Sequence, residues 1–421
     1  MTAKKRPLGL FSLLMLGING IVGVGIFLMP SEVASVAPGN VGIGIFAVTA
    51  LLMLPVAFVY AILSSRFDED GGAVVFARQA FGPGAAFAIG WLAYVATMLS
   101  ATAIAIGLAR SLAPDLGLEG PYAGPVCASL VALTAATASS RGLLFSARVW
   151  NFLTIGKLLP LCAFILASWL LISNLPAPVP TTEPPMSALL RATLLATFAY
   201  QGFEVIPLIT GQTRNSSRVI PLALVGSLSI VALLYVSIQA ACVYALPDLA
   251  HTRSPIISAA AVFGGAQFAA IVRAGATVSG LGIVFSLVTM SPRYLVALGS
   301  DGSLPGGLER LGKNGAPLRG LALTAALMIA IIAVGERANV FTLSSLVMVC
   351  QYACISAALL SLALRKRNKL SWKHALVAIP AIAVSLALAS AASINEWLVA
   401  LAVFALGLGL RGVARRSRSA P

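Results

Sequence analysis

The sequence contains few charged residues. Asp, Glu, Lys and Arg make up 10% of the 421 residues, whereas they make up about a quarter of a soluble protein. Hydrophobic side chains make up 59%. So little charge cannot cover a water-facing surface, which excludes an ordinary soluble protein and a disordered chain. The composition therefore predicts a membrane protein.

Histidine and cysteine are also scarce. His251, His374 and the five cysteines show no metal-ligand spacing, and all the cysteines lie within apolar runs. We expect no metal site, no disulfide scaffold and no cofactor. Nucleic acid is not an expected partner despite the net charge of +15, because the basic residues are scattered and do not cluster with aromatic side chains.

Long apolar runs, by contrast, are abundant. Twelve of them, separated by charge, glycine and proline, are close to the roughly 20 residues that a transmembrane helix needs. They cover approximately residues 8–30, 42–65, 84–109, 122–139, 147–172, 189–210, 219–245, 267–290, 318–334, 340–364, 374–392 and 396–412. We expect an all-α polytopic protein with a single transmembrane domain over residues 1–421, embedded in the lipid bilayer.

The basic residues between these runs predict the orientation. With twelve crossings, 22 of the 28 Lys and Arg fall on the side of the N-terminus and four on the opposite side. The other two, Lys157 and Arg273, lie inside predicted helices. Cytoplasmic connections are enriched in Lys and Arg, so we expect both termini in the cytoplasm and the chain in the cytoplasmic (inner) membrane.

Two of the twelve segments carry helix-breaking residues near their middle. In 8–30, the run Gly17-Ile18-Asn19-Gly20-Ile21-Val22-Gly23-Val24-Gly25 has four glycines in nine residues. In 189–210, Gly202 lies among polar groups and Pro207 follows about one turn later. The two segments run in opposite directions, so the breaks are related by inversion, which is typical of transporters built from inverted repeats. The alternative is that these glycines only allow close helix packing.

Broken backbone within the membrane needs polar partners. The N–H groups of Gly23, Val24 and Gly25 suit a carboxylate, because they lie at the positive end of a helix dipole. Carbonyl groups near the breaks suit an ammonium group, so together the two breaks match an amino acid zwitterion. The predicted substrate-binding residues are Ile21, Gly23, Val24, Gly25, Phe198, Ala199, Gln201 and Gly202.

Three motifs resemble those of one transporter superfamily. Gly20-Ile21-Val22-Gly23-Val24-Gly25-Ile26-Phe27, Phe198-Ala199-Tyr200-Gln201-Gly202-Phe203-Glu204 and the stretch from Arg293 to Asp301-Gly302-Ser303-Leu304-Pro305 are similar to signatures of the amino acid-polyamine-organocation (APC) superfamily. The resemblance implies a LeuT-like fold with helices 1 and 6 broken. Residues 8–172 would form the first repeat of five helices, 189–364 the inverted second repeat, and 374–412 two additional helices.

The same resemblance implies alternating access to a central amino acid site without a sodium requirement. It makes Phe198 the aromatic gate over the substrate, and it assigns carbonyl groups of Ile21, Phe198 and Gln201 to the substrate amine. Val24 departs from the pattern, since relatives commonly carry Ser or Thr there. One hydroxyl contact to the carboxylate is therefore missing, which leaves room for an amine substrate.

Lys157 is predicted to lie near the middle of segment 147–172, too deep for its ammonium group to reach water. In relatives, a similar lysine approaches the unwound first helix where sodium-coupled members hold sodium. We expect Lys157 to act in coupling, with a proton as the coupling ion. Two readings stay open: the lysine changes its protonation state during transport, or it is a permanently charged tether.

Glu204, at the second predicted break, is the second charged residue that we expect to act within the membrane. Its carboxylate could take part in coupling by accepting a proton, or it could hold a basic side chain. Equally, it could only cap the helix that follows. The helix over 84–109 is expected to add side chains to the pocket, from among Tyr94, Thr97, Met98 and Ser100.

These features favour a secondary active transporter for a small amino acid, neutral and with an apolar side chain. The alternatives are a carrier or antiporter of polyamines, amines or cationic amino acids. An enzyme is not expected, because no convergent nucleophile, metal set or paired acid lies within the predicted helices. Association as a homodimer stays open.

Overall fold

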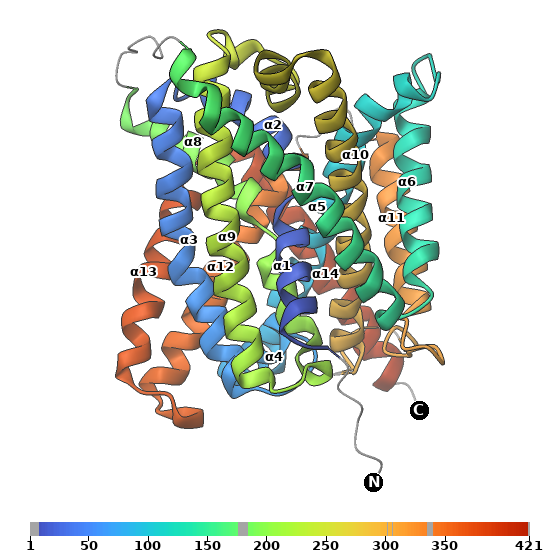
Figure 1. The fold of residues 1–421 in the computed structure, drawn as a ribbon. Helices are drawn as coiled ribbons and strands as arrows, with labels where there is room; N and C mark the ends of the chain where they lie inside the picture. Colours follow the sequence, from blue (N-terminus) through green and yellow to red (C-terminus); the bar gives the residue numbers. More distant parts are fainter. Residues whose placement is uncertain (1–7, 176–183, 301, 305, 335–339, 420–421) are drawn as a thin grey trace.

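A computed structural model describes residues 8–175, 184–300, 302–304, 306–334 and 340–419. The described chain is helical, and its one strand-like contact is an isolated bridge between Leu8 and Thr213. The apolar runs explain this, because within lipid a helix pairs every interior backbone N–H and C=O inside one segment. α1 begins and α14 ends at the same end of the bundle, at the bottom of Figure 1, here called the basal end.

The α-helices are α1 (Leu10–Ile21), α2 (Val24–Ala34), α3 (Asn40–Arg66), α4 (Ala73–Phe81), α5 (Pro83–Asp115), α6 (Ala123–Ser139), α7 (Leu143–Leu171), α8 (Met186–Tyr200), α9 (Ser216–Ala245), α10 (Pro255–Ser300), α11 (Leu318–Val334), α12 (Val340–Leu364), α13 (Trp372–Ala389) and α14 (Ile394–Ser419). The 3-10 helices are η1 (Ile172–Asn174), η2 (Phe203–Gln212), η3 (Leu249–His251) and η5 (Arg367–Lys369).

Every predicted apolar segment coincides with a helix or a broken helix. Among the described residues, nine helices are long and apolar enough to cross a membrane, or ten if α1 and α2 together count as one span. The chain is thus a multi-pass membrane protein. α6 and α11 have 17 residues each, about 25 Å of helix against a hydrocarbon core of about 30 Å. Twelve crossings therefore remain a prediction.

Two features were not predicted. α4 is a short, largely buried helix that precedes α5 at the basal end. α10 is bent at Gly264 and Gly265, where Gly265 has a φ of 73° that favours glycine. The residues before this bend thus form a separate arm of α10.

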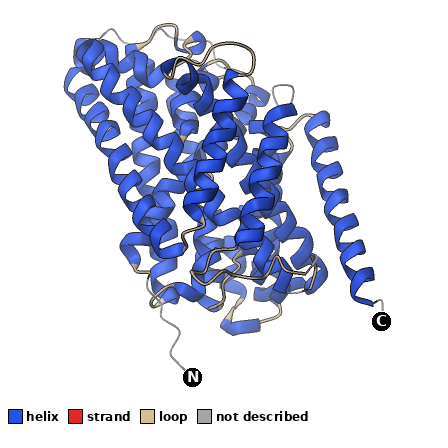
Figure 2. Cartoon of the chain, turned by 90° about the vertical axis from the view of Figure 1, so that its right-hand side faces the viewer, coloured by secondary structure: helices blue, strands red, loops and turns tan. Residues whose placement is uncertain are grey.

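The helices differ in how deeply they lie in the bundle. α5 and the α8–η2 segment are the most enclosed, whereas a minority of the residues of α13 and few residues of α14 are buried. Figure 2 shows the C-terminal helix standing at the edge of the bundle. The interior is therefore built around α5 and α8–η2, and the second predicted break lies in this interior.

Candidate functional site

Both predicted breaks leave the α-helix. α1 ends at Ile21, and Val22 and Gly23 are extended before α2 begins. α8 ends at Tyr200, Gln201 is extended, and Gly202 has a φ of 120°. The segment after the second break is the 3-10 helix η2, within which Pro207 has no N–H to donate.

The two breaks lie against each other. A Cβ atom added to Gly20 would be 2.8 Å from the Gly202 carbonyl oxygen, and one added to Gly202 would overlap the Gly20 carbonyl group. A Cβ atom on Gly25 would be 3.3 Å from the Phe198 ring and 3.5 Å from the Ala199 Cα. Only glycine permits this approach, and at Gly202 only glycine also fits the backbone conformation.

A small cavity lies at this contact. It is lined by Gly20, Ile21, Gly25, Thr97, Ser100, Ile104, Phe198, Ala199, Gln201, Gly202, Glu204, Ile283, Leu287 and Met348. Its volume is about 20 Å³, which is room for about one water molecule. The chain is therefore closed around this point, and any larger ligand requires the lining side chains to move apart.

Six of the eight predicted substrate-binding residues line this cavity: Ile21, Gly25, Phe198, Ala199, Gln201 and Gly202. Gly23 packs at α10, because a Cβ atom there would overlap Ile283. The side chain of Val24 lies outside the described residues. From α5, Thr97 and Ser100 reach the cavity.

Sequence reasoning missed the contributions of Ile104, Ile283, Leu287 and Met348. Ile283 and Leu287 are four residues apart, so they lie on one face of α10. Serines and glycines, among them Ser279, Gly280 and Gly282, are spread over several faces of this run, so the sequence does not indicate which face turns toward the cavity.

Lys157 of α7 is fully buried and reaches the first break. Its Nζ donates hydrogen bonds to the carbonyl oxygen of Asn19, at 3.0 Å, and to that of Val22. Ser279 of α10 donates to the same Val22 oxygen at 3.2 Å. No acidic side chain of the described chain pairs with Lys157, so backbone carbonyl groups alone hold its amine.

The carbonyl group of Ile21, which was expected to face the substrate amine, already accepts one hydrogen bond. The donor is the hydroxyl of Tyr235 in α9, at 2.9 Å. One lone pair of that oxygen is thereby used, and the second stays free to accept a hydrogen bond.

Glu204 is almost fully buried, and its carboxylate is already bonded. It accepts hydrogen bonds from the backbone N–H of Gly202, at 2.9 and 3.1 Å, and from the Tyr352 hydroxyl of α12 at 2.8 Å. The carboxylate thus pairs the backbone N–H of Gly202, the residue that precedes η2.

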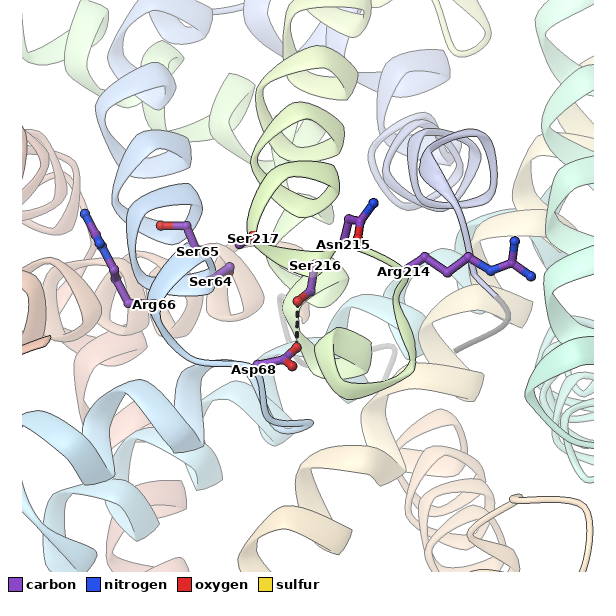
Figure 3. A pocket seen from close by; sticks show the side chains of 8 residues that line it. All are labelled: Ser64, Ser65, Arg66, Asp68, Arg214, Asn215, Ser216 and Ser217. Carbon is purple, nitrogen blue, oxygen red and sulfur yellow. Dashed lines mark hydrogen bonds between the residues drawn. The ribbon is translucent and has the colours of Figure 1, made fainter. Parts of the chain in front are cut away.

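A larger pocket of about 560 Å³ opens at the basal ends of α3 and α9. It is lined by Ser64, Ser65, Arg66, Asp68, Arg214, Asn215, Ser216 and Ser217. The Ser216 hydroxyl donates a hydrogen bond to the Asp68 carboxylate, with 2.6 Å between the two oxygen atoms. In Figure 3 the side chains of Arg66 and Arg214 extend to opposite sides of this pair. This pocket shares no lining residue with the central cavity, so it is separate from the predicted site.

The loop between α3 and α4 closes the basal end beneath η2. Asp70 accepts hydrogen bonds from the backbone N–H of Gly211 at 2.8 Å and from the Gln212 amide at 3.1 Å. The N–H of Gly71 donates to the Leu208 carbonyl at 3.2 Å. These bonds tie the segment after the second break to the loop between α3 and α4.

A multi-pass helical bundle with two broken helices around a buried cavity defines an integral membrane protein with an internal binding site. Comparison with known proteins identifies its family. The amino acid permease family model matches residues 8–407. The chain therefore belongs to this family and to the APC superfamily, and it is a transporter rather than an enzyme.

Its relatives differ in the cargo that their names state. The chain is 27% identical over 340 residues to a branched-chain amino acid permease, BcaP, of Bacillus subtilis, covering 73% of this chain and 70% of that protein. It is 27% identical over 339 residues to an arginine/ornithine antiporter of Pseudomonas aeruginosa, covering 77% and 69%. It is 25% identical over 322 residues to a methylthioribose transporter of Bacillus subtilis, covering 72% and 68%.

Replacing Gly202 with alanine should disrupt the contact between the breaks. The new Cβ atom would overlap the Gly20 carbonyl group and force an unfavourable φ, which costs roughly 1–3 kcal/mol. We expect a lower melting temperature of the purified protein and loss of substrate binding. Gly409→Ala is the control, because a Cβ atom there meets nothing within 4 Å and alanine favours a helix. Equal melting temperatures of the two variants would contradict the close approach.

Proposed function

We propose that this chain is a sodium-independent secondary transporter that carries a small neutral amino acid by alternating access. Transport is coupled to protons or proceeds by exchange. One observation carries the proposal: two chain breaks lie against each other beside a buried cavity. Unwound backbone within a membrane is tolerated where it lines a binding cavity or is buried in protein.

The proposal includes twelve crossings arranged as two inverted repeats of five helices and two further helices. Helix packing supports this arrangement. α3 packs along α9 and α5 along α10, and these are the second and third helices of the two proposed repeats. The distribution of the basic residues favours a protein of the cytoplasmic membrane with both termini in the cytoplasm.

In the proposed site, backbone N–H groups at the start of α2 bind the substrate carboxylate, aided by the helix dipole. Carbonyl groups of Ile21, Phe198 and Gln201 receive the amine, and Phe198 covers the substrate. The side chains of Ile104, Ile283, Leu287 and Met348 favour an apolar substrate side chain. A cationic side chain is disfavoured, because the Glu204 carboxylate already holds two donors.

A thermal-shift screen of the purified protein against common amino acids and amines, at two pH values, tests the substrate class. A ligand that binds only the folded protein raises the melting temperature. We expect shifts with small neutral amino acids and none with putrescine or arginine. Gly25→Leu should abolish the shifts, because its side chain would press on the Phe198 ring. Unchanged shifts in Gly25→Leu would exclude the proposed site.

Glu204→Gln separates a neutral from a cationic substrate. A carboxylate that binds the cargo would make the variant lose a cationic substrate altogether. We expect neutral amino acids still to bind, within about tenfold of the unmodified protein, because the amide oxygen can still accept from Gly202. Binding of arginine by the unmodified protein and its loss in the variant would favour the cationic alternative.

Lys157 is proposed to couple transport to protons through the first break. Lys157→Ala should abolish the pH dependence of uptake into proteoliposomes, or trap one state, because the carbonyl groups of Asn19 and Val22 lose their partner. Lys157→Arg separates the two readings, because arginine stays charged. Normal pH-dependent uptake by Lys157→Arg would favour a permanent tether, and the same result for Lys157→Ala would exclude any coupling role.

A further inference from the structure

The side chain of Gln201 lacks a hydrogen-bond partner within the described structure. Gln201 is 6% exposed, it lines the central cavity, and neither its Nε2 nor its Oε1 atom is paired. Buried polar groups without partners are rare and unfavourable. An unpaired amide at the wall of a binding cavity therefore points to a ligand that pairs it.

The other polar side chains of the cavity are already engaged. The Thr97 hydroxyl donates to the Ala93 carbonyl at 2.8 Å. The Ser100 and Ser344 hydroxyls are bonded to each other at 2.5 Å, and Glu204 holds the Gly202 N–H and the Tyr352 hydroxyl. Gln201 is thus the polar lining side chain whose donor and acceptor are both available.

A carboxamide presents N–H donors and a carbonyl acceptor side by side. An ammonium group only donates and a carboxylate only accepts, so neither group of the amino acid backbone complements both atoms. A hydroxyl both donates and accepts, and a second carboxamide can pair with both atoms at once. The chemistry of Gln201 therefore matches a polar, uncharged side chain.

We propose that Gln201 determines specificity, and that the substrate is a small neutral amino acid whose side chain carries a hydroxyl or carboxamide group. This inference rests on the proposed function and adds one polar group to the apolar side chain favoured there. The remaining lining, Ile104, Ile283, Leu287 and Met348, packs against the aliphatic part of the same side chain. The backbone carbonyl group of Gln201 keeps its separate role toward the amine.

Amino acid pairs of matched shape test the proposal. Threonine and valine differ by a hydroxyl in place of a methyl group, and asparagine and leucine by a carboxamide in place of an isopropyl group. Calorimetric titration of the full-length protein should show the polar member of at least one pair binding about tenfold more tightly. A difference between threonine and valine would indicate a substrate hydroxyl, and a difference between asparagine and leucine would indicate a substrate carboxamide.

Gln201→Met keeps the side-chain length and removes both polar atoms, so the polar-to-apolar affinity ratio should fall to about one. Gln239→Met is the matched control. Gln239 of α9 is also buried with both amide atoms unpaired, but it does not line the cavity. The control should keep the ratio of the unmodified protein.

Three results would overturn the inference. If the unmodified protein bound both members of each pair equally, Gln201 could not determine specificity for a polar side chain, whether or not the variant folds. If Gln201→Met lost affinity equally for all ligands, the Gln201 amide would bind the amino and carboxylate groups common to them. If the polar-to-apolar affinity ratio did not change in this variant, the amide would bind only water. If the unmodified protein bound no amino acid at all, the proposed function would fail as well.

Discussion

The structure depends on one requirement: backbone groups freed by two chain breaks inside a membrane protein must find polar partners without bulk water. The partners come from three other helices. Lys157 of α7 and Ser279 of α10 pair the Val22 carbonyl group, and Tyr235 of α9 pairs that of Ile21. At the second break the Glu204 carboxylate pairs the Gly202 N–H. The buried Lys157 and Glu204 are thus bonded directly to the broken backbone, so a change in either charge would act on the geometry of a break.

The same breaks set the size of the cavity. Glycine at positions 20 and 202 lets the two main chains touch, and the Phe198 ring closes against Gly25. Beneath the cavity, Glu204 bonds Tyr352, whose ring stacks on Phe203, and the Tyr60 ring packs edge-on against both rings. The side chains below the site are therefore large and closely packed.

Much of this arrangement was predictable from patterns in the sequence. The start of α11 at Leu318 and the end of α12 at Leu364 agree with the predicted segments, because Pro317 precedes the first run and Arg365 follows the second. The break at Gly202 was predictable because glycine, glutamine and glutamate interrupt an apolar segment. The bend in α10 and the short helix α4 were not, because their residues also suit an uninterrupted helix or a loop. The bonding partners of Glu204 were not predictable, because the sequence allowed a proton acceptor, a partner of a basic side chain or a helix cap at this position.

The sequence by itself determined the class of protein, the helical segments and the two places where the helix fails, since each depends on local composition and on lipid as a solvent. Only the tertiary structure decided which groups meet there. Lys157 and Asn19 are 138 positions apart, and Gln201 lines the same cavity as Leu287 and Met348 from two other helices. The rotation of each helix about its axis sets such contacts, and that rotation follows from packing with neighbours. An apolar run that is hydrophobic on every face carries little record of it.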